Sequence, residues 1–364
     1  MGIVNGFTKP VYIAAWARVQ RENVTGTGRT GVRDVAKVAE VSVATVSRYL
    51  NGSLDLPDGT RARIDGAVAT LGYRPNPHAR RLSLGRSDTL ALVIPDIANP
   101  FFARLSAAME RAAAERGRMV TLHGTGNDDA REAAVLDLAS ENLADGVVFL
   151  TNHVAAPGIA ERLNRFPRAV IVDEDVPGAR APRLMCDNEQ GGYLAGSHLY
   201  AAGHRDVAYI GGGSALFSTA ARLAGLRRGL QGRDATRRYV DDHAASAGRS
   251  LAAQFLAERE GETALFVGSD ELLLGVLETF RAQGVRIPQD ISVVSFDNVR
   301  SLHLFDPPIT AVQQPVEALG RRAIELLLDG TWTDPAFRQT TELMPVQLID
   351  RTSVGAPAHT TTKV

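Results

Sequence analysis

In the first part of the chain, apolar residues recur every three or four positions in three short runs, which is the spacing of one helical face. The first run predicts a helix over residues 32–39. Ser42 is suited to cap a second helix that begins at Val43. A third helix is predicted from Asp58 to Leu71, with Gly72 as its C-cap. Three short helices with a tight turn between the first two form the helix-turn-helix arrangement.

The second of these helices lies in the segment VSVATVSRYLNG, residues 41–52. Its apolar side holds Val41, Val46 and Leu50. The opposite side carries Val43, Ala44, Ser47 and Arg48. An exposed face of this composition suits the edges of DNA bases, because apolar side chains contact thymine methyl groups and an arginine donates two hydrogen bonds to guanine.

The pattern changes at Thr89, where continuous apolar runs begin to alternate with helical segments. The first series of expected strands is TLALVIPD, MVTLHG, DGVVFLTN and AVIVDED. A second series begins near Asp187 with VAYIGGG, RRYVDD, TALFVGSD and ISVVSFD. Strands that alternate with helices predict parallel sheets covered on both faces. Two such series predict two lobes, with a ligand cleft at the carboxyl ends of the strands.

The chain has 364 residues, which favours two or three domains, and its net charge of −1 hides an asymmetry. The segment from Arg29 to Ser87 holds ten Lys/Arg and five Asp/Glu, whereas the residues from Asp88 onward hold 27 Lys/Arg and 35 Asp/Glu. A small basic segment joined to a large acidic one indicates a head that binds a polyanion.

The sequence argues against several other classes of protein. Cys186 is the one cysteine, so a disulfide framework or a cysteine-based zinc site within the chain is excluded. No apolar run reaches the roughly 18 residues that a membrane span needs. Residues 1–30 do not resemble a signal peptide, and we interpret them as a flexible tail. We therefore expect a cytoplasmic protein with no cofactor and no bound metal.

The stretches VRDVAKVAEVSVATVSRYLNG and TRARIDGAVATLGYRPNPHARRL resemble the DNA-binding head of the lactose-repressor (LacI/GalR) family of transcription regulators. The resemblance is close over residues 31–85 and continues to about residue 352. It implies an all-α helix-turn-helix head and an α/β, two-lobed body that resembles periplasmic sugar-binding proteins, with two parallel doubly wound sheets. The domains implied are a tail (1–30), the head (31–75), a hinge (76–87), an effector-binding and dimerisation body (88–352) and a second tail (353–364). Within the body, the first lobe covers about residues 88–187 and 316–343, and the second lobe covers about residues 188–313 and 344–352.

In this family, the first residues of the second helix and an arginine one turn later read the bases, and a leucine in the hinge wedges into the minor groove. Short hydroxyl side chains on the same helix suit phosphate contacts. The DNA-binding residues implied are Ser42, Val43, Ala44, Thr45, Ser47, Arg48, Asn51, Ala79 and Leu82. The chain departs from the family at Glu40, where a glycine is usual. If this position needs a positive φ, the side chain costs on the order of 1 kcal/mol.

Polar and aromatic residues follow the expected strands of the body, and the positions match effector contacts of the family. The resemblance implies effector contacts at Phe101, Phe102, Asp173, Ser218, Arg222, His243, Ser269, Asp297 and Gln314. Asp270, which follows the TALFVG strand, is a further candidate for the effector site, with a plain helix cap as the alternative. Carboxylates, an arginine and amides around aromatic rings suit a polyhydroxylated ligand. His243 and Leu216 stand where the family's purine-responding member has an aromatic residue and an arginine that reads the base. Their presence favours a sugar-like effector over a purine.

The sequence thus predicts a repressor of a sugar or related catabolic operon that binds double-stranded DNA at a pseudopalindromic operator as a homodimer, away from membranes. A purine- or nucleoside-responsive corepressor-type regulator remains an alternative, as does, more remotely, a binding protein or hydrolase without a DNA function. We expect no enzymatic activity, because no nucleophile elbow, Walker motif or zinc-ligand cluster is present. Whether the ligand releases or favours DNA is left open by the sequence.

Overall fold

The structure is a computed structural model, and it describes residues 31–74, 87–141 and 144–357. The chain divides into two compact units, residues 1–85 and residues 86–364. The expected N-terminal tail and the two hinge residues Ala79 and Leu82 lie outside the described residues. In the described ranges, no helix is both long and apolar enough to cross a bilayer.

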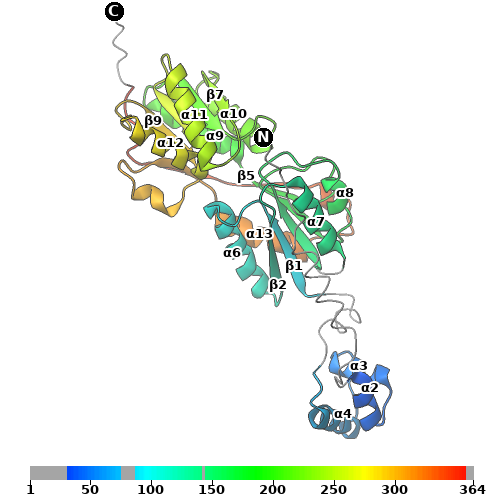
Figure 1. Cartoon of the computed structure of the whole chain (residues 1–364). Coiled ribbons are helices and arrows are strands. Elements are labelled where there is room, and N and C mark those ends of the chain that lie inside the picture. Colours follow the sequence, from blue (N-terminus) through cyan, green and yellow to red (C-terminus); the bar gives the residue numbers. More distant parts are fainter. Residues whose placement is uncertain (1–30, 75–86, 142–143, 358–364) are drawn as a thin grey trace, which may run out of the picture. The chain divides into compact units, whose positions relative to one another are not determined.

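The head contains the three helices that the apolar spacing predicts (Figure 1): α2 Val32–Val38, α3 Val43–Leu50 and α4 Asp58–Leu71. They bury one small core between them. Its fully or nearly buried members are Val35, Ala36, Ala39, Val46, Ile64 and Ala67. The predicted fold of the head is therefore confirmed.

Capping residues fix where these helices begin and end. The Ser42 hydroxyl accepts a hydrogen bond from the Thr45 backbone N–H at 3.0 Å, which satisfies a free donor in the first turn of α3. Gly72 ends α4 in the left-handed conformation, with φ of 58°. Glu40, in the turn between α2 and α3, has φ of 53°. The turn thus needs the positive φ that glycine adopts freely, and here a glutamate occupies it.

The first lobe of the body is built on a six-stranded sheet, sheet A, with the strand order β11-β5-β4-β3-β1-β2 and parallel neighbours throughout. Its strands are β1 Thr89–Ile94, β2 Met119–Gly124, β3 Gly146–Leu150, β4 Ala169–Val172, β5 Arg183–Cys186 and β11 Thr341–Met344. Its helices are α6 Pro100–Ala114, α7 Asp129–Ser140, α8 Ile159–Leu163, α13 Val316–Asp329 and the short 3₁₀ helix η2 Phe337–Gln339. Alternate residues of β1 pack against α6 and α13 on one face and α7 and α8 on the other.

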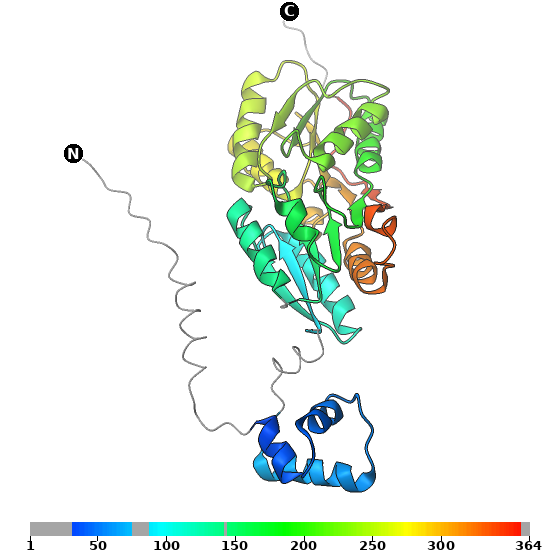
Figure 2. The ribbon, with the colours of Figure 1, turned by 90° about the vertical axis from the view of Figure 1, so that its right-hand side faces the viewer.

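The second lobe repeats this plan on sheet B, with the order β12-β10-β9-β8-β6-β7 and one antiparallel pair, β10 with β12. Its strands are β6 Val207–Gly211, β7 Arg238–Val240, β8 Ala264–Val267, β9 Ser292–Phe296, β10 Thr310–Gln313 and β12 Gln347–Ile349. Its helices are α9 Asn188–Ala201, α10 Phe217–Gly229, α11 Ala245–Glu258, α12 Asp270–Ala282 and η1 Arg300–His303. Helices flank the sheet of each lobe (Figure 2). The predicted α/β body with two doubly wound sheets is confirmed.

The chain passes between the lobes three times, after β5, after β10 and after β11. Gln314 lies at the second passage, as expected. The strands β5, β10, β11 and β12 have three or four residues each and were not predicted. Sheet A also extends through Met344, one residue beyond the expected boundary of the first lobe.

Helices α9 and α10 approach each other closely through glycines. A Cβ on Gly192 would overlap the backbone carbonyl oxygen of Arg222, and one on Gly225 would overlap that of Glu189. Only glycine permits this approach. Because Arg222 belongs to the expected effector site, this helix packing also sets its position.

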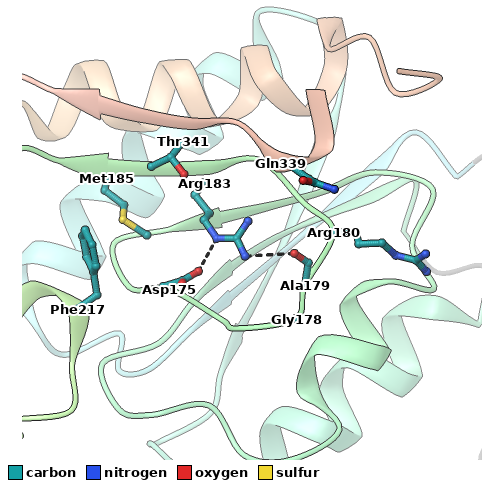
Figure 3. Close-up of a pocket in the computed structure, with 9 residues that line it drawn as sticks. All are labelled: Asp175, Gly178, Ala179, Arg180, Arg183, Met185, Phe217, Gln339 and Thr341. Atoms are coloured by element: carbon teal, nitrogen blue, oxygen red, sulfur yellow. Dashed lines mark hydrogen bonds and ion pairs between the residues drawn. The ribbon is translucent and has the colours of Figure 1, made fainter. Parts of the chain in front are cut away.

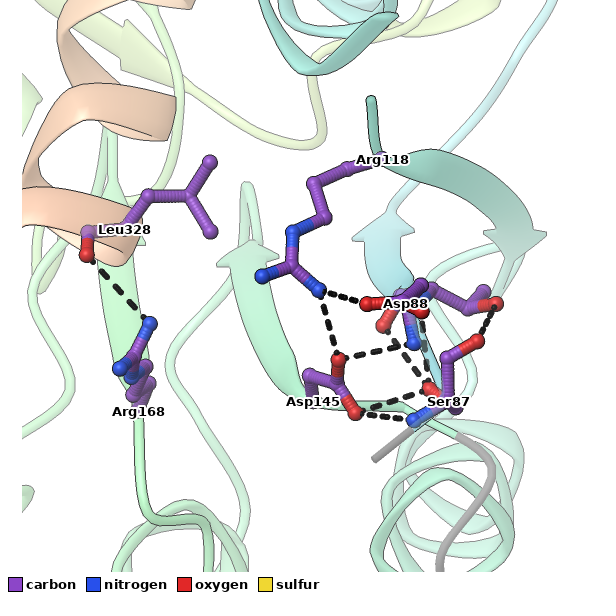
Figure 4. A network of polar contacts seen from close by, with 7 residues as sticks. Ser87, Asp88, Arg118, Asp145, Arg168 and Leu328 are labelled. Atoms are coloured by element: carbon purple, nitrogen blue, oxygen red, sulfur yellow. Dashed lines mark hydrogen bonds and ion pairs between the residues drawn. The ribbon is translucent and has the colours of Figure 1, made fainter. Parts of the chain in front are cut away.

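Asp145 holds the residues at which the chain enters the first lobe (Figure 4). Its carboxylate accepts hydrogen bonds from the Ser87 N–H at 2.6 Å, the Ser87 hydroxyl at 3.0 Å and the Asp88 N–H at 2.9 Å. Arg118 pairs with both Asp145 and Asp88. Ser87 is buried here, so it belongs to the body and not to the hinge, where the sequence had placed it.

The predicted tail from residue 353 is also wrong at its start. Ser353 is fully buried, and its hydroxyl donates to the Val293 carbonyl at 2.6 Å and accepts from the Thr310 N–H at 2.8 Å. The Gly355 N–H donates to the Ser292 hydroxyl at 3.0 Å. Buried backbone groups of β9 and β10 need partners, and this segment supplies them.

We predict that Glu40→Gly stabilises the head by about 1 kcal/mol, because it relieves the left-handed backbone of a non-glycine residue. Chemical denaturation of the full chain, followed by a signal from the head, measures the change. Glu40→Ala is the control: it removes the carboxylate but keeps a Cβ at positive φ. Equal stabilities of the two variants would show that charge, and not backbone strain, is the relevant factor.

Candidate functional site

The exposed face of α3 is the candidate DNA-reading surface. Val43 is 41% exposed, whereas Val46 on the opposite side is fully buried. Ala44 and Arg48 are exposed as well, and the Arg48 Nε approaches only the Ala44 carbonyl oxygen, at 3.4 Å. In the described part of the chain Arg48 makes no ion pair, so its guanidinium remains available for a ligand.

The remaining head residues of the expected set lie on the same helix. Ser42 is its N-cap and Asn51 its C-cap. The Ser42 and Thr45 hydroxyls are hydrogen-bonded to each other at 2.8 Å, and Ser47 is half-buried. The structure thus gathers seven of the nine expected DNA-binding residues on α3 and its caps; the other two, Ala79 and Leu82, are outside the described residues.

In the body, the carboxyl ends of the strands of both lobes meet at one cleft. All ten expected effector residues line it: Phe101, Phe102, Asp173, Ser218, Arg222, His243, Ser269, Asp270, Asp297 and Gln314. The cavity measures about 40 Å³, far below the roughly 300–1,000 Å³ of an open ligand site. The lining side chains therefore leave less free volume between the lobes than a ligand of the size of a sugar occupies.

Arg222 is held rigidly at the centre of this cleft. It is 4% exposed, and its Nε donates to the Asn188 side-chain oxygen at 2.8 Å. A second guanidinium nitrogen donates to the Gly268 carbonyl, and the guanidinium lies 3.7 Å from the centre of the Phe296 ring. Among the described residues no carboxylate forms an ion pair with Arg222, so hydrogen bonds to neutral partners orient its guanidinium.

Asp173 and Asp297 occupy equivalent places, each directly after the fourth strand of its lobe. Both adopt left-handed backbone conformations, with φ of 78° and 73°. Non-glycine residues in this region carry a cost of about 1–3 kcal/mol, and such strain concentrates at functional sites. Asp297 is further fixed by a hydrogen bond from the Gln314 amide at 2.6 Å.

The cleft perturbs its titratable groups strongly. Burial and the charge of Glu174 raise the pKa of Asp173 to about 8. Burial and the charge of Asp297 raise the pKa of Asp270 to about 7. Burial and the charge of Arg222 lower the pKa of His243 to about 3, so this imidazole is neutral at pH 7. Its ring lies against Gly212, where a Cβ would overlap it.

Comparison with known proteins identifies the family. The family described as bacterial regulatory proteins, lacI family, matches residues 32–76, and the periplasmic binding protein-like domain matches residues 197–354. The HTH-type transcriptional repressor CytR of Escherichia coli K12 is 32% identical over 302 residues, which cover 82% of this chain and 89% of that protein. The chain belongs to the lacI family of bacterial regulatory proteins. It is accordingly a ligand-responsive, DNA-binding transcriptional regulator.

Solved structures of regulators are similar over the same span. A crystal structure of the Lac repressor dimer bound to operator and the anti-inducer ONPF is 26% identical, with a TM-score of 0.74, and covers 90% of this chain and 100% of that chain. A complex of the transcriptional regulator CelR with cellobiose is 29% identical, with a TM-score of 0.66, and covers 89% of this chain and 100% of that chain.

The cleft of this lacI-family protein also contains three residues that the sequence analysis missed: Asn99, Asn152 and Glu174. Asn99 caps α6, and its side chain accepts from the Phe101 N–H at 2.8 Å. Glu174 of the first lobe reaches the N-terminus of α10 in the second lobe, with its carboxylate oxygens 3.3 and 3.4 Å from the Ser218 N–H. The adjacency of Glu174 to Asp173 was a usable signal, but its contact with α10 is visible only in the fold.

A second hollow, of about 470 Å³, is lined mainly by the first lobe, with Phe217 of α10 from the second lobe (Figure 3). Its lining is Asp175, Gly178, Ala179, Arg180, Arg183, Met185, Phe217, Gln339 and Thr341. Arg183 pairs with Asp175 and donates to the Ala179 carbonyl at 3.2 Å, so its donors already have partners in the protein. The hollow is larger than the cavity of the cleft.

We predict that Asp173→Asn stabilises the ligand-free body increasingly as the pH rises from about 4 to 8. The raised pKa means that folded wild type retains a proton in this range that the unfolded chain has lost, so the stability that Asp173 contributes falls as the pH rises. Asparagine tolerates positive φ and cannot ionise. Calorimetric melting temperatures at several pH values measure the difference.

Glu110→Gln, which neutralises an exposed carboxylate on α6, is the matched control. Its melting-temperature difference from wild type should stay nearly constant with pH. A constant difference for Asp173→Asn as well would contradict the desolvation of this carboxylate.

Proposed function

We propose that this lacI-family regulator is a repressor of a sugar or related catabolic operon, and that it acts in the cytoplasm as a homodimer on a pseudopalindromic operator. The observation that carries the proposal is the combination, in one chain, of an exposed Val43–Ala44–Arg48 face on α3 with a closed polar cleft in the body. The similar Lac repressor is a dimer bound to operator, which supports the dimer and the operator. The protein acts as a regulator and not as an enzyme.

The DNA-reading role rests on exposure and chemistry. Arg48 presents a planar guanidinium without a charged partner, which suits the O6 and N7 atoms of a guanine. Val43 and Ala44 offer apolar contact to thymine methyl groups. The hydroxyl groups of α3 set the register on the phosphates, and Leu82 of the hinge, with Ala79 beside it, enters the minor groove as a wedge.

The effector role of the cleft rests on its polar lining. Two phenylalanines provide an apolar wall, and the carboxylates, amides and Arg222 provide donors and acceptors for several hydroxyl groups. We propose a sugar or sugar derivative as the effector, which the cellobiose complex of the similar regulator CelR supports.

Ligand and DNA are coupled through the first lobe. A ligand that favours one separation of the lobes moves the point at which the hinge begins, because Asp145 fixes Ser87 and Asp88 to that lobe. The effector binds one arrangement of the lobes more tightly than the other, so it increases the population of that arrangement. Operator affinity falls or rises according to whether that arrangement binds DNA less or more tightly.

Arg48→Ala should weaken operator binding by about 1–3 kcal/mol and relax the preference at one base pair, because it removes a bidentate base contact. The operator is first selected from a random duplex library, and affinities are then measured by fluorescence anisotropy at fixed salt. Lys37→Ala removes the same charge from the exposed side of α2 and should weaken binding without changing sequence preference. An unchanged preference in Arg48→Ala would refute the readout assignment.

Arg222→Lys should abolish the effector response while operator affinity in the absence of effector stays within twofold of wild type. The lysine keeps the charge but loses the planar guanidinium that Asn188 and Gly268 hold in place. Sugars, sugar phosphates, polyols and nucleosides are screened by thermal shift, and operator release is then titrated with the best ligand. Arg249→Lys, on the exposed side of α11, is the control. A normal response in Arg222→Lys would mean that the effector binds elsewhere.

A further inference from the structure

The lining of the cleft is strongly unbalanced in charge. Four carboxyl groups, those of Asp173, Glu174, Asp270 and Asp297, line the cleft with one guanidinium, that of Arg222, and Arg104 lies in the adjoining hollow with Asp297. The histidine in the lining is neutral at pH 7 and adds no positive charge. Burying like charges without compensation is costly, so such an arrangement calls either for protons on the carboxylates or for a cation among them.

Two of the four carboxylates have partners of their own. Glu174 accepts from the N-terminus of α10, whose partial positive charge suits an anion. Asp297 accepts from the Gln314 amide at 2.6 Å.

The other two lack this compensation. The Asp173 carboxylate accepts no hydrogen bond in the described part of the chain, and Asp270 is only 3% exposed. One Asp270 oxygen, Oδ1, accepts from the Glu271 N–H at 2.9 Å, but Oδ2 is buried without a hydrogen-bond partner. The Gln314 Oε1 is a second buried acceptor without a partner at the same cleft. These acceptors point to a ligand rich in donors.

A metal ion does not fit this arrangement. Among the described residues, only Asp129, Glu132 and His153 form a group of three or more acidic, histidine or cysteine side chains with possible metal-ligand atoms within 4.8 Å of one another. These three residues do not line the cleft. The carboxylates of the cleft are spread over both lobes, so they surround a larger organic cation more readily than they coordinate a small one. A protonated amine also brings up to three donors for the free acceptor oxygens.

We infer that the effector of this cleft is a polyhydroxylated ring that bears a protonated amino group, placed next to Asp270 and within the field of Asp173 and Asp297. This inference rests on the proposed effector role of the cleft and narrows the ligand to amino sugars and related hydroxylated amines. A neutral sugar supplies hydroxyl donors but does not favour the ionised form of the Asp173 and Asp270 carboxyl groups, whose raised pKa values keep them largely protonated. A protonated amine supplies donors and compensates the charge together.

The test is a titration calorimetry series on the full-length protein at pH 6.5. The probes are D-glucosamine, D-galactosamine and D-mannosamine, each compared with its neutral parent hexose and its N-acetyl derivative. We expect at least one amine to bind tenfold or more tightly than both of its neutral counterparts. A parent hexose or N-acetyl derivative that binds as tightly as the amine overturns the inference, and so does a series in which no amine binds at millimolar concentration.

Proton exchange gives a second readout. A bound cation favours the ionised carboxylates, so binding of the amine should release protons, which titrations in two buffers of different ionisation enthalpy detect. Asp270→Asn and Asp173→Asn should each lower affinity for the amine at least tenfold and reduce the release of protons, whereas Glu110→Gln should change neither. Variants that retain full affinity for the amine overturn the inference.

Operator binding measured in parallel separates this inference from the proposed function. An amine that binds with the expected selectivity but leaves operator affinity unchanged upholds the ligand class inferred for the cleft and contradicts the effector role of the proposed function. A neutral sugar that binds and alters operator affinity upholds the proposed function and overturns the inference.

Discussion

The contact between Glu174 and the N-terminus of α10 joins the two lobes of the body across the cleft. The residue before α10, Leu216, has no side chain that can cap the helix. Free backbone N–H groups at a buried helix start need an acceptor, and the opposite lobe provides it. When the lobes separate, water can replace this acceptor, so closure gains little from the contact alone and a ligand can shift the balance.

The remainder of the site is arranged before any ligand arrives. Close packing of α9 on α10 through glycines fixes the backbone of Arg222, and neutral partners orient its guanidinium. Two strained aspartates, Asp173 and Asp297, direct their carboxyl groups from the ends of equivalent strands. Preorganisation of this kind lowers the entropy that a ligand loses in ordering its site. The cleft also buries four carboxyl groups, so the charge of a bound ligand changes how readily these groups ionise.

The route from the cleft to the head begins at Asp145. Its carboxylate holds the first residues of the body to sheet A, so a movement of the first lobe carries the start of the hinge with it. The head is a separate unit with a small core of its own, and its turn carries the strained Glu40. The head therefore holds the exposed face of α3, which we propose reads DNA, through its own core and independently of the body.

Local signals in the sequence determined those parts of the structure that depend on interactions between residues close together in the chain. The helical period, with the caps at Ser42 and Gly72, predicted the three helices of the head. Apolar runs predicted the two sheets. The polar residues at the ends of these runs, together with the family resemblance, predicted the ten residues that line the cleft. Strands β11 and β12, the buried Ser353 and the contact of Glu174 with α10 were not predicted, because each is stabilised by partners far away in the chain. The charge balance of the cleft was likewise decided by the tertiary structure alone: four carboxyl groups scattered over more than 120 positions act on one another only when folding removes them from water and brings them together.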